Sequence, residues 1–208
     1  MGTAVSGMRV FFHRRLIVQN DCRLWARSIA SEWRPDIVVF LAKSGFLFAE
    51  PIADELGCPL VEVCASRPDN GAKDAVRDRV AWLPRWALAL ALSAKSGYVR
   101  HERDSRRDVR PGASLSAIDL CEYQHILLVD DSVDTGWSMA GAVKLLQEMA
   151  PESEIRVASY CVVGGSESRV KCDYRRYDDA IVMTATSRFS PEYKRFLDDY
   201  KQWRATIS

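Results

Sequence analysis

The stretch from Ile126 to Met149 restricts the fold of this chain more than any other, because it joins an apolar run to two carboxylates, a glycine turn and a helical pattern. The run Ile126 to Val129 is typical of a strand buried in the middle of a parallel sheet. Ala140 to Met149 has the apolar spacing of a helix. The sequence therefore predicts a strand, a turn and a helix, with the polar residues at the carboxyl end of the strand.

Two groups of polar residues lie between this strand and this helix. Asp130 and Asp131 supply carboxylate oxygens, which suit a pair of vicinal hydroxyls or the water shell of Mg²⁺. The turn that follows can direct backbone N–H groups and two hydroxyls to one place, at the positive end of the helix dipole. It consists of Asp134-Thr135-Gly136-Trp137-Ser138. Together these features predict a site for a sugar phosphate.

The segment Asp130 to Gly136, after Ile-Leu-Leu-Val, resembles the motif with which type I phosphoribosyltransferases bind 5-phosphoribosyl 1-diphosphate (PRPP). The resemblance implies that Asp130 and Asp131 hold the ribose hydroxyls and bind Mg²⁺ through water. It also implies that the residues from Asp134 to Ser138 surround the 5-phosphate, with Asp134 as the general base. Trp137 departs from the pattern, since the family often has a Lys, an Arg or a small residue there.

The diphosphate loop of the resembled family has a counterpart in Ala42-Lys43-Ser44-Gly45. This tetrapeptide follows the predicted strand Ile37 to Leu41, so a turn there would present backbone N–H groups to an anion. The family usually has a small residue, a basic residue and two glycines in this loop, and Ser44 replaces one of the glycines. The resemblance implies that Ala42, Lys43, Ser44 and Gly45 bind the diphosphate of PRPP.

Two alternatives to this interpretation concern the acidic motif. Leu-Leu-Val-Asp-Asp-Ser also opens phosphorylation receiver domains, which need a phosphoaccepting Asp on a later strand. The later strand candidates, Ile155 to Val163 and Ala180 to Met183, carry no terminal Asp, and this disfavours a receiver. Asp134 could instead cap the following helix, and that role stays open beside the catalytic one.

Repeated strand and helix patterns predict a doubly wound α/β fold with a mostly parallel sheet. Residues 9–18 are predicted as a strand, and Asp21 as the N-cap of a helix that ends before Pro35. The next unit consists of the strand Ile37 to Leu41, the helix Phe46 to Leu56, which Gly57 ends, and the strand Leu60 to Val63. Residues 126–163 repeat this unit, so ligands are expected at the carboxyl ends of the strands.

The resemblance implies that residues 1–208 form a single phosphoribosyltransferase-like domain with a long insertion and a small hood. An insertion at about residues 66–115 corresponds to a loop that closes over the site in the family. Between residues 67 and 110 it holds eleven Lys or Arg against six Asp or Glu. A packed helix followed by a solvated basic loop is one alternative, and a surface that touches lipid or another subunit is another. A small hood that builds the acceptor pocket is expected from about residues 1–20 and 184–208. Ser190-Pro191-Glu192 predicts the start of a core-packing helix within the second of these.

The amino-acid composition indicates the cellular compartment of the protein and the kinds of partner that it binds. The six cysteines show no CxxC pair, which indicates a reduced protein. No segment reaches the roughly eighteen apolar residues of a transmembrane span, and no secretory signal is recognised, so a cytoplasmic enzyme is predicted. No nucleic-acid partner is expected, because acidic residues interrupt the basic segment. A homodimer is one possibility.

The sequence lacks two residues with which the 6-oxopurine branch of the family recognises its acceptor base. In that branch a Lys ends the strand after the PRPP motif, and an aromatic residue beyond it stacks on the base. Here Val163 and Gly164 occupy the position of the Lys, and Ala180 that of the aromatic residue. Each missing contact is worth about 1–3 kcal/mol, which disfavours purine salvage.

Three functions follow from the resemblance. The preferred one is an enzyme that transfers 5-phosphoribosyl from PRPP to a non-purine acceptor with release of diphosphate. Its best candidate acceptor is a sugar hydroxyl in the biosynthesis of a ribofuranosyl polysaccharide. The second function is a nucleobase phosphoribosyltransferase of nucleotide salvage. The third is a non-catalytic, PRPP-sensing regulator. The two enzymatic functions imply Mg²⁺ as the cofactor.

Overall fold

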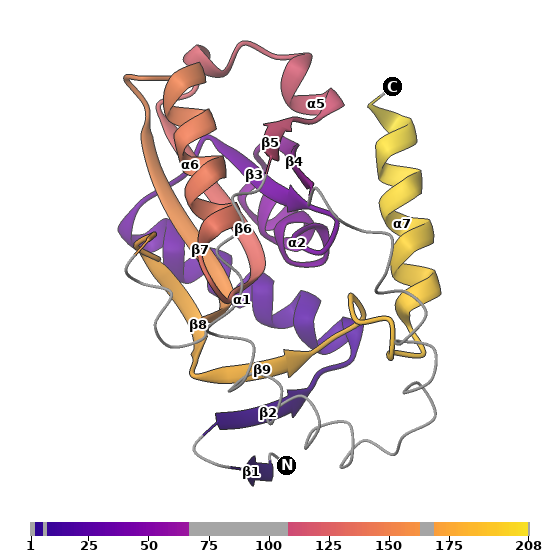
Figure 1. The fold of residues 1–208 in the computed structure, drawn as a ribbon. Coiled ribbons are helices and arrows are strands. Elements are labelled where there is room, and N and C mark those ends of the chain that lie inside the picture. The colour runs from indigo at the N-terminus through magenta and orange to yellow at the C-terminus, as the bar shows by residue number, and fades with distance from the viewer. Residues whose placement is uncertain (1–2, 6–7, 67–107, 163–168, 208) are drawn as a thin grey trace.

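A six-stranded sheet forms the centre of the protein (Figure 1). The computed structural model describes residues 3–5, 8–66, 108–162 and 169–207. The strand order is β5-β4-β3-β6-β7-β8, and all neighbours are parallel except β4 and β5. The strands are β3 (Ile37–Ala42), β4 (Leu60–Ser66), β5 (Asp108–Pro111), β6 (His125–Val133), β7 (Glu154–Val162) and β8 (Tyr174–Asp178). The prediction of a doubly wound α/β fold is confirmed.

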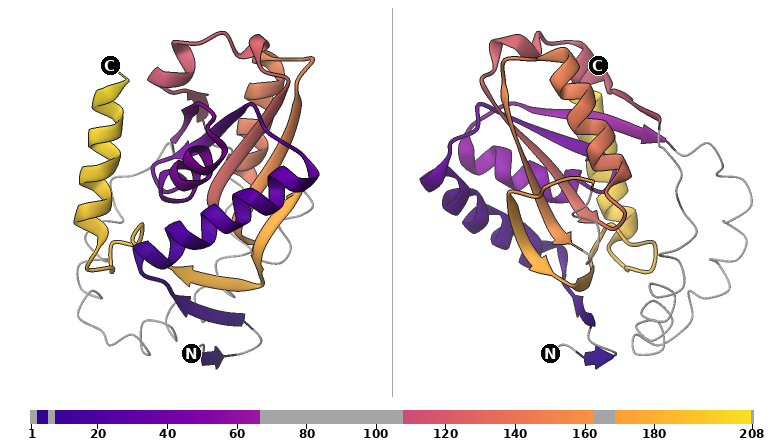
Figure 2. Two further views of the ribbon diagram at one scale, coloured as in Figure 1. Left: turned by 180° about the vertical axis from the view of Figure 1, so that it is seen from behind. Right: turned by 60° about the vertical axis from the view of Figure 1, so that its left-hand side comes forward.

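Helices cover both faces of this sheet (Figures 1 and 2). One core contains residues of α1 (Arg15–Glu32), α2 (Phe46–Leu56) and α7 (Tyr193–Thr206). The other contains residues of α6 (Trp137–Met149), the short α5 (Ala113–Ser116) and the 3₁₀ turn η1 (Leu120–Glu122). Side chains of β3 alternate between the two cores, as expected of a strand buried on both sides. None of the described helices is both long and apolar enough to cross a bilayer.

The two central strands are followed by crossovers that run in opposite directions. From β3 the chain passes through α2 to β4, whereas from β6 it passes through α6 to β7. Because β3 and β6 are parallel neighbours, the loops after them begin side by side and then separate. In doubly wound sheets such a divergence creates the crevice in which ligands bind.

A second sheet pairs the two N-terminal strands with a strand from late in the chain, in the order β1-β2-β9. Its strands are β1 (Thr3–Val5), β2 (Met8–Phe12) and β9 (Ala180–Met183), with β1 antiparallel and β9 parallel to β2. In Figure 1 this small sheet lies below the main one. The segments expected to form the hood contain β1, β2 and α7, and their role in acceptor binding stays a prediction. Most of the predicted lid, residues 67–107, lies outside the described residues.

The first helix begins earlier than predicted. The strand before it ends at Phe12 and α1 starts at Arg15, so the prediction of Asp21 as N-cap is wrong. Leu16 and Ile17 look like strand residues, yet both are exposed, whereas Val18 is fully buried. The spacing of the buried residues follows the helical period, which favours a helix over a strand in this segment. These residues are Val18, Cys22, Trp25, Ala26 and Ile29.

The Asp21 carboxylate takes part in a tertiary network instead of capping a helix. It accepts hydrogen bonds from the Tyr160 hydroxyl (2.9 Å) and from Nε and Nη2 of Arg176 (3.0 and 2.6 Å). His13 Nδ1 lies 3.2 Å from the same Tyr160 hydroxyl. Burial opposes ionisation of Asp21, but the hydrogen bonds from Arg176 and Tyr160 outweigh it and lower its pKa. Burial also lowers the pKa of His13.

We expect this network to make the protein less stable as the pH falls from about 7 to 5. The folded state disfavours the imidazolium form of His13, so the unfolded chain binds this proton first, below the ordinary histidine pKa of about 6.5. The lowered pKa of Asp21 contributes only at more acidic pH, below about 4. His13→Asn should flatten the decline in melting temperature between about pH 6.5 and 5, and an unchanged slope would exclude His13 as its origin.

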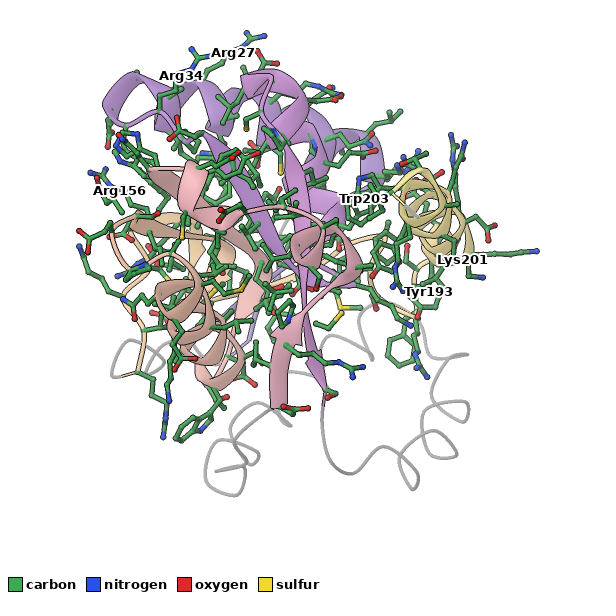
Figure 3. All side chains as sticks on the ribbon, turned by 90° about the horizontal axis from the view of Figure 1, so that it is seen from above. Arg27, Arg34, Arg156, Tyr193, Lys201 and Trp203 are labelled. Atoms are coloured by element: carbon green, nitrogen blue, oxygen red, sulfur yellow. The ribbon has the colours of Figure 1, made fainter. Side chains whose placement is uncertain are left out.

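The predicted core packing of the C-terminal helix is confirmed. Trp203 of α7 contacts Phe40 and Phe46, with ring centroids 5.1 and 5.3 Å apart (Figure 3). The Tyr200 hydroxyl donates a 2.6 Å hydrogen bond to Oε2 of Glu62, whose side chain on β4 is fully buried. The helix is therefore held to the sheet by a polar contact inside an aromatic cluster.

Tyr200→Phe should lower the free energy of unfolding by about 1–3 kcal/mol, because it leaves a buried carboxylate oxygen without its donor. For a chain of this length each 1 kcal/mol corresponds to about 2–4 °C in melting temperature. Tyr193→Phe is a matched control on the same helix, since that hydroxyl has no hydrogen-bond partner among the described residues. Equal melting temperatures for the two variants would show that the Glu62 contact does not stabilise the fold.

Candidate functional site

The two loops predicted to bind PRPP lie side by side at the carboxyl ends of β3 and β6, and a cavity of about 300 Å³ opens between them. Ala42 and Ser44 of the first loop line it, together with every residue from Asp130 to Met139 of the second. Lys43 and Gly45 are not part of the lining: Lys43 is exposed and Gly45 is buried beneath the loop. The predicted residues therefore meet in one place, with these two exceptions.

The loop after β3 packs closely on the main chain of both central strands. The Ala42–Lys43 peptide bond is cis. A Cβ atom on Gly45 would lie 2.7 Å from the carbonyl oxygen of Leu41 and 3.1 Å from that of Val129, which is closer than side-chain carbons approach such atoms. Only glycine fits this position without displacing a strand end.

The turn after β6 leaves the start of α6 open toward the cavity. Gly136 adopts the left-handed conformation (φ 76°), which suits glycine, and it is the N-cap of α6. No side chain caps this helix, and its first turn contains no acidic residue. Its first N–H groups are therefore available to an anion at the positive end of the dipole. Asp134 is exposed and does not cap α6, so the alternative role considered for it is not supported.

The two acids lie in a polar environment. Asp130 is buried, and its Oδ1 accepts a 2.8 Å hydrogen bond from the N–H of Asp131. Burial raises the pKa of Asp131, although hydrogen bonds that include one from Ser44 oppose the shift. Within the described part of the chain, no basic side chain lies within ion-pair distance of Asp131. Such a carboxylate suits a sugar hydroxyl or a hydrated divalent cation.

A metal ion would need additional ligands at this site. Among the described residues, no group of three or more His, Cys, Asp or Glu side chains is placed to hold an ion. Mg²⁺ typically binds through one or two carboxylates, with water and substrate phosphates completing its shell. The pair Asp130 and Asp131 fits that mode of binding.

Two residues from distant parts of the chain reach the site and were not predicted. Thr186, after β9, places its hydroxyl 3.5 Å from Oδ2 of Asp131. Arg169, between β7 and β8, donates a hydrogen bond from Nη1 to the carbonyl oxygen of Thr135 (3.3 Å). Its guanidinium carbon also lies 4.7 Å from the centroid of the Trp137 ring. No local pattern signals either residue, because only the folded chain brings them to the motif.

Of the positions at which the 6-oxopurine branch recognises its base, the structure describes only Ala180. Val163 and Gly164, which occupy the position of the family's purine-binding Lys, lie outside the described residues. Ala180 is fully buried at the start of β9, and its carbonyl oxygen accepts a hydrogen bond from the Cys161 thiol. An alanine in this position offers no ring on which a base could stack.

Comparison with known proteins identifies a family whose model covers both loops of this site. The model of the phosphoribosyl transferase domain family matches residues 13–188. No curated protein matches the chain by sequence.

Solved structures with the same fold cover nearly the whole chain. A purine phosphoribosyltransferase from Pyrococcus horikoshii has a TM-score of 0.58 and 15% identity over 87% of this chain and 95% of its own. A xanthine-guanine-hypoxanthine phosphoribosyltransferase from Helicobacter pylori has a TM-score of 0.58 and 13% identity over 94% and 99%. A hypothetical protein from Neisseria gonorrhoeae with bound ppGpp has a TM-score of 0.57 and 12% identity over 94% and 97%. At such identities the likeness concerns the fold, whereas the family match also covers the motif and its loops. The chain belongs to the type I phosphoribosyltransferase family.

Proposed function

We propose that the protein transfers the 5-phosphoribosyl group of PRPP to a nucleophilic acceptor, with release of diphosphate. The observation that carries the proposal is the cavity at the divergence of β3 and β6. Two carboxylates, an uncapped helix N-terminus and a tight loop of small residues line it or lie directly beneath it. These are the groups that ribose hydroxyls, a phosphate and a diphosphate require.

Each part of PRPP has a counterpart in this cavity. The turn from Asp134 to Ser138 would bind the 5-phosphate through the N–H groups at the start of α6. Asp130 and Asp131 would accept hydrogen bonds from the ribose hydroxyls. The loop from Ala42 to Gly45 would bind the diphosphate. Lys43 is exposed, so packing does not hold its side chain in one place and its ammonium group can turn toward the ligand.

Asp130 and Asp131 would also hold Mg²⁺, largely through water. When bound, Mg²⁺ neutralises negative charge that builds up on the departing diphosphate. Burial raises the pKa of Asp131 in the protein alone, and a nearby divalent cation would favour the ionised carboxylate.

The reaction replaces one bond at C1 of the ribose by another. A bond forms between C1 and the acceptor atom as the bond from C1 to the diphosphate oxygen breaks, and the acceptor loses a proton. Asp134 would accept this proton, because its carboxylate is exposed, lines the cavity and is not engaged as a helix cap.

A nucleobase is the acceptor class that we place first. Two of the most similar structures are named as purine and xanthine-guanine-hypoxanthine phosphoribosyltransferases, and they support this choice. The sugar hydroxyl preferred from the sequence is the second candidate. The buried Ala180 supports it, since no stacking ring is present at that position.

Release of diphosphate from PRPP in the presence of Mg²⁺ and a panel of acceptors tests the proposal. The panel contains hypoxanthine, guanine, xanthine, uracil and orotate beside oligosaccharide acceptors, and each product is isolated. Turnover with a nucleobase supports the first acceptor class, and turnover with an oligosaccharide supports the second. Tight binding of PRPP without turnover for any acceptor would contradict an enzymatic role and favour a PRPP-sensing regulator.

A further inference from the structure

We propose that Arg169 is a positioning residue for the 5-phosphate, which it orders through the turn between β6 and α6. The inference rests on the proposed function, because it concerns how the same cavity holds the phosphate of PRPP. Arg169 belongs to the connection between β7 and β8, far in sequence from the motif. Its guanidinium nevertheless makes two contacts with the motif, one to a main-chain oxygen and one to an aromatic ring.

The main-chain contact controls the direction of a peptide group in the turn. Nη1 of Arg169 donates to the carbonyl oxygen of Thr135 at 3.3 Å. The peptide group that contains this carbonyl also contains the N–H of Gly136, and the group is planar and trans. The N–H of a trans peptide points away from its carbonyl, so holding the oxygen of Thr135 also holds the direction of the Gly136 N–H. Gly136 lines the cavity, and its N–H is therefore kept in one orientation before the phosphate arrives.

The aromatic contact fixes the position of the guanidinium. Its carbon atom lies 4.7 Å from the centroid of the Trp137 ring, within the range of a cation–π interaction. Trp137 is the first residue of α6 and lines the cavity. The flat guanidinium can rest on the ring and donate to Thr135 at the same time, which the compact ammonium group of a lysine could not do equally well.

The positive charge of Arg169 is compatible with an anionic ligand at the start of α6. A positive side chain beside the N-terminus of a helix is unfavourable, because it faces the positive end of the dipole. A phosphate bound at that N-terminus would interact favourably with both the dipole and the guanidinium. Ordering of the turn and attraction of the dianion would therefore act together on the 5-phosphate, because the contacts of Arg169 are with the turn after β6.

The test compares two ligands that separate the two ends of PRPP. Calorimetry with ribose 5-phosphate reports the 5-phosphate site, and calorimetry with magnesium diphosphate reports the other loop. Arg169→Gln should weaken ribose 5-phosphate about tenfold, which corresponds to about 1.4 kcal/mol, and leave magnesium diphosphate within about twofold. Arg169→Lys should fall between Arg169→Gln and the wild type, because it keeps the charge and loses the planar fork. In turnover, KM for PRPP should rise with little change in kcat.

Arg156→Gln is the matched control. The Arg156 guanidinium carbon lies 4.7 Å from the centroid of the Trp33 ring, the same distance as in the pair at the site. Arg156 is near the amino end of β7 and lies on the side of the molecule opposite α7 (Figure 3). This variant loses the same kind of contact away from the cavity, so its affinity for both ligands should equal that of the wild type.

The outcomes separate the inference from the proposed function. If the wild type binds neither ribose 5-phosphate nor PRPP, the proposed function itself fails. If the wild type binds ribose 5-phosphate and Arg169→Gln binds it equally well, the role of Arg169 alone is refuted. Equal losses for ribose 5-phosphate and magnesium diphosphate would indicate general damage to the site and would also refute the specific role.

Discussion

We expect replacement of Asp134 by Asn to lower kcat by roughly 10²- to 10⁴-fold and to keep the affinity for PRPP within a few-fold of the wild type. The amide has nearly the same shape as the carboxylate but cannot accept the acceptor's proton. The backbone N–H groups proposed to hold the phosphate remain in place, because Asp134 is exposed and does not cap α6. The affinity for PRPP should therefore be kept when the proposed base is replaced.

Single-turnover measurement of diphosphate release, combined with calorimetry of PRPP binding, separates the two effects. Asp198→Asn serves as the control, since this aspartate is exposed on α7 and does not line the cavity. It should leave kcat and affinity unchanged. An Asp134→Asn enzyme with the turnover of the wild type would show that another group, or bulk water, accepts the proton.

We expect replacement of Gly45 by Ala to lower kcat/KM for PRPP by about 10²-fold, since displacing a substrate-positioning loop by about 1 Å has effects of that size. The new methyl group would lie 2.7 Å from the carbonyl oxygen of Leu41 and 3.1 Å from that of Val129. Both atoms belong to the main chain of central strands, so the loop itself must move. The Ala42 and Ser44 side of the cavity would move with it. Overpacking of this kind also destabilises a fold by about 1–3 kcal/mol.

Steady-state kinetics and thermal melts measure the two consequences of Gly45→Ala. Gly57→Ala is the control for substituting a glycine at all: Gly57 ends α2 at φ 66°, and a Cβ there meets nothing within 4 Å. The backbone strain at Gly57 costs about 1 kcal/mol and lies outside the cavity, so that variant should lose stability and keep its kcat/KM. A Gly45→Ala enzyme with normal kcat/KM would show that the loop after β3 does not take part in binding PRPP.

Local sequence patterns were sufficient for much of the fold. The strands around Ile37 to Leu41 and Ile126 to Val129, and the helix that ends at Gly57, are where they were predicted. The start of the first helix was predicted wrongly, because Leu16 and Ile17 have strand-like side chains. Asp21 is a good cap by type, yet its carboxylate binds Arg176 and Tyr160, which are more than a hundred residues away.

The sequence by itself determined the family, the two central strands and the glycine turn between β6 and α6, because a buried apolar run, paired acids and a glycine that can adopt positive φ are all encoded by neighbouring residues. Only the tertiary structure decided which distant side chains complete the site. Arg169 reaches Thr135 and Trp137, and Thr186 approaches Asp131, because parallel crossovers bring separate segments to one edge of the sheet. Such contacts depend on the path of the whole chain and leave no periodic or local signal at the residues that make them.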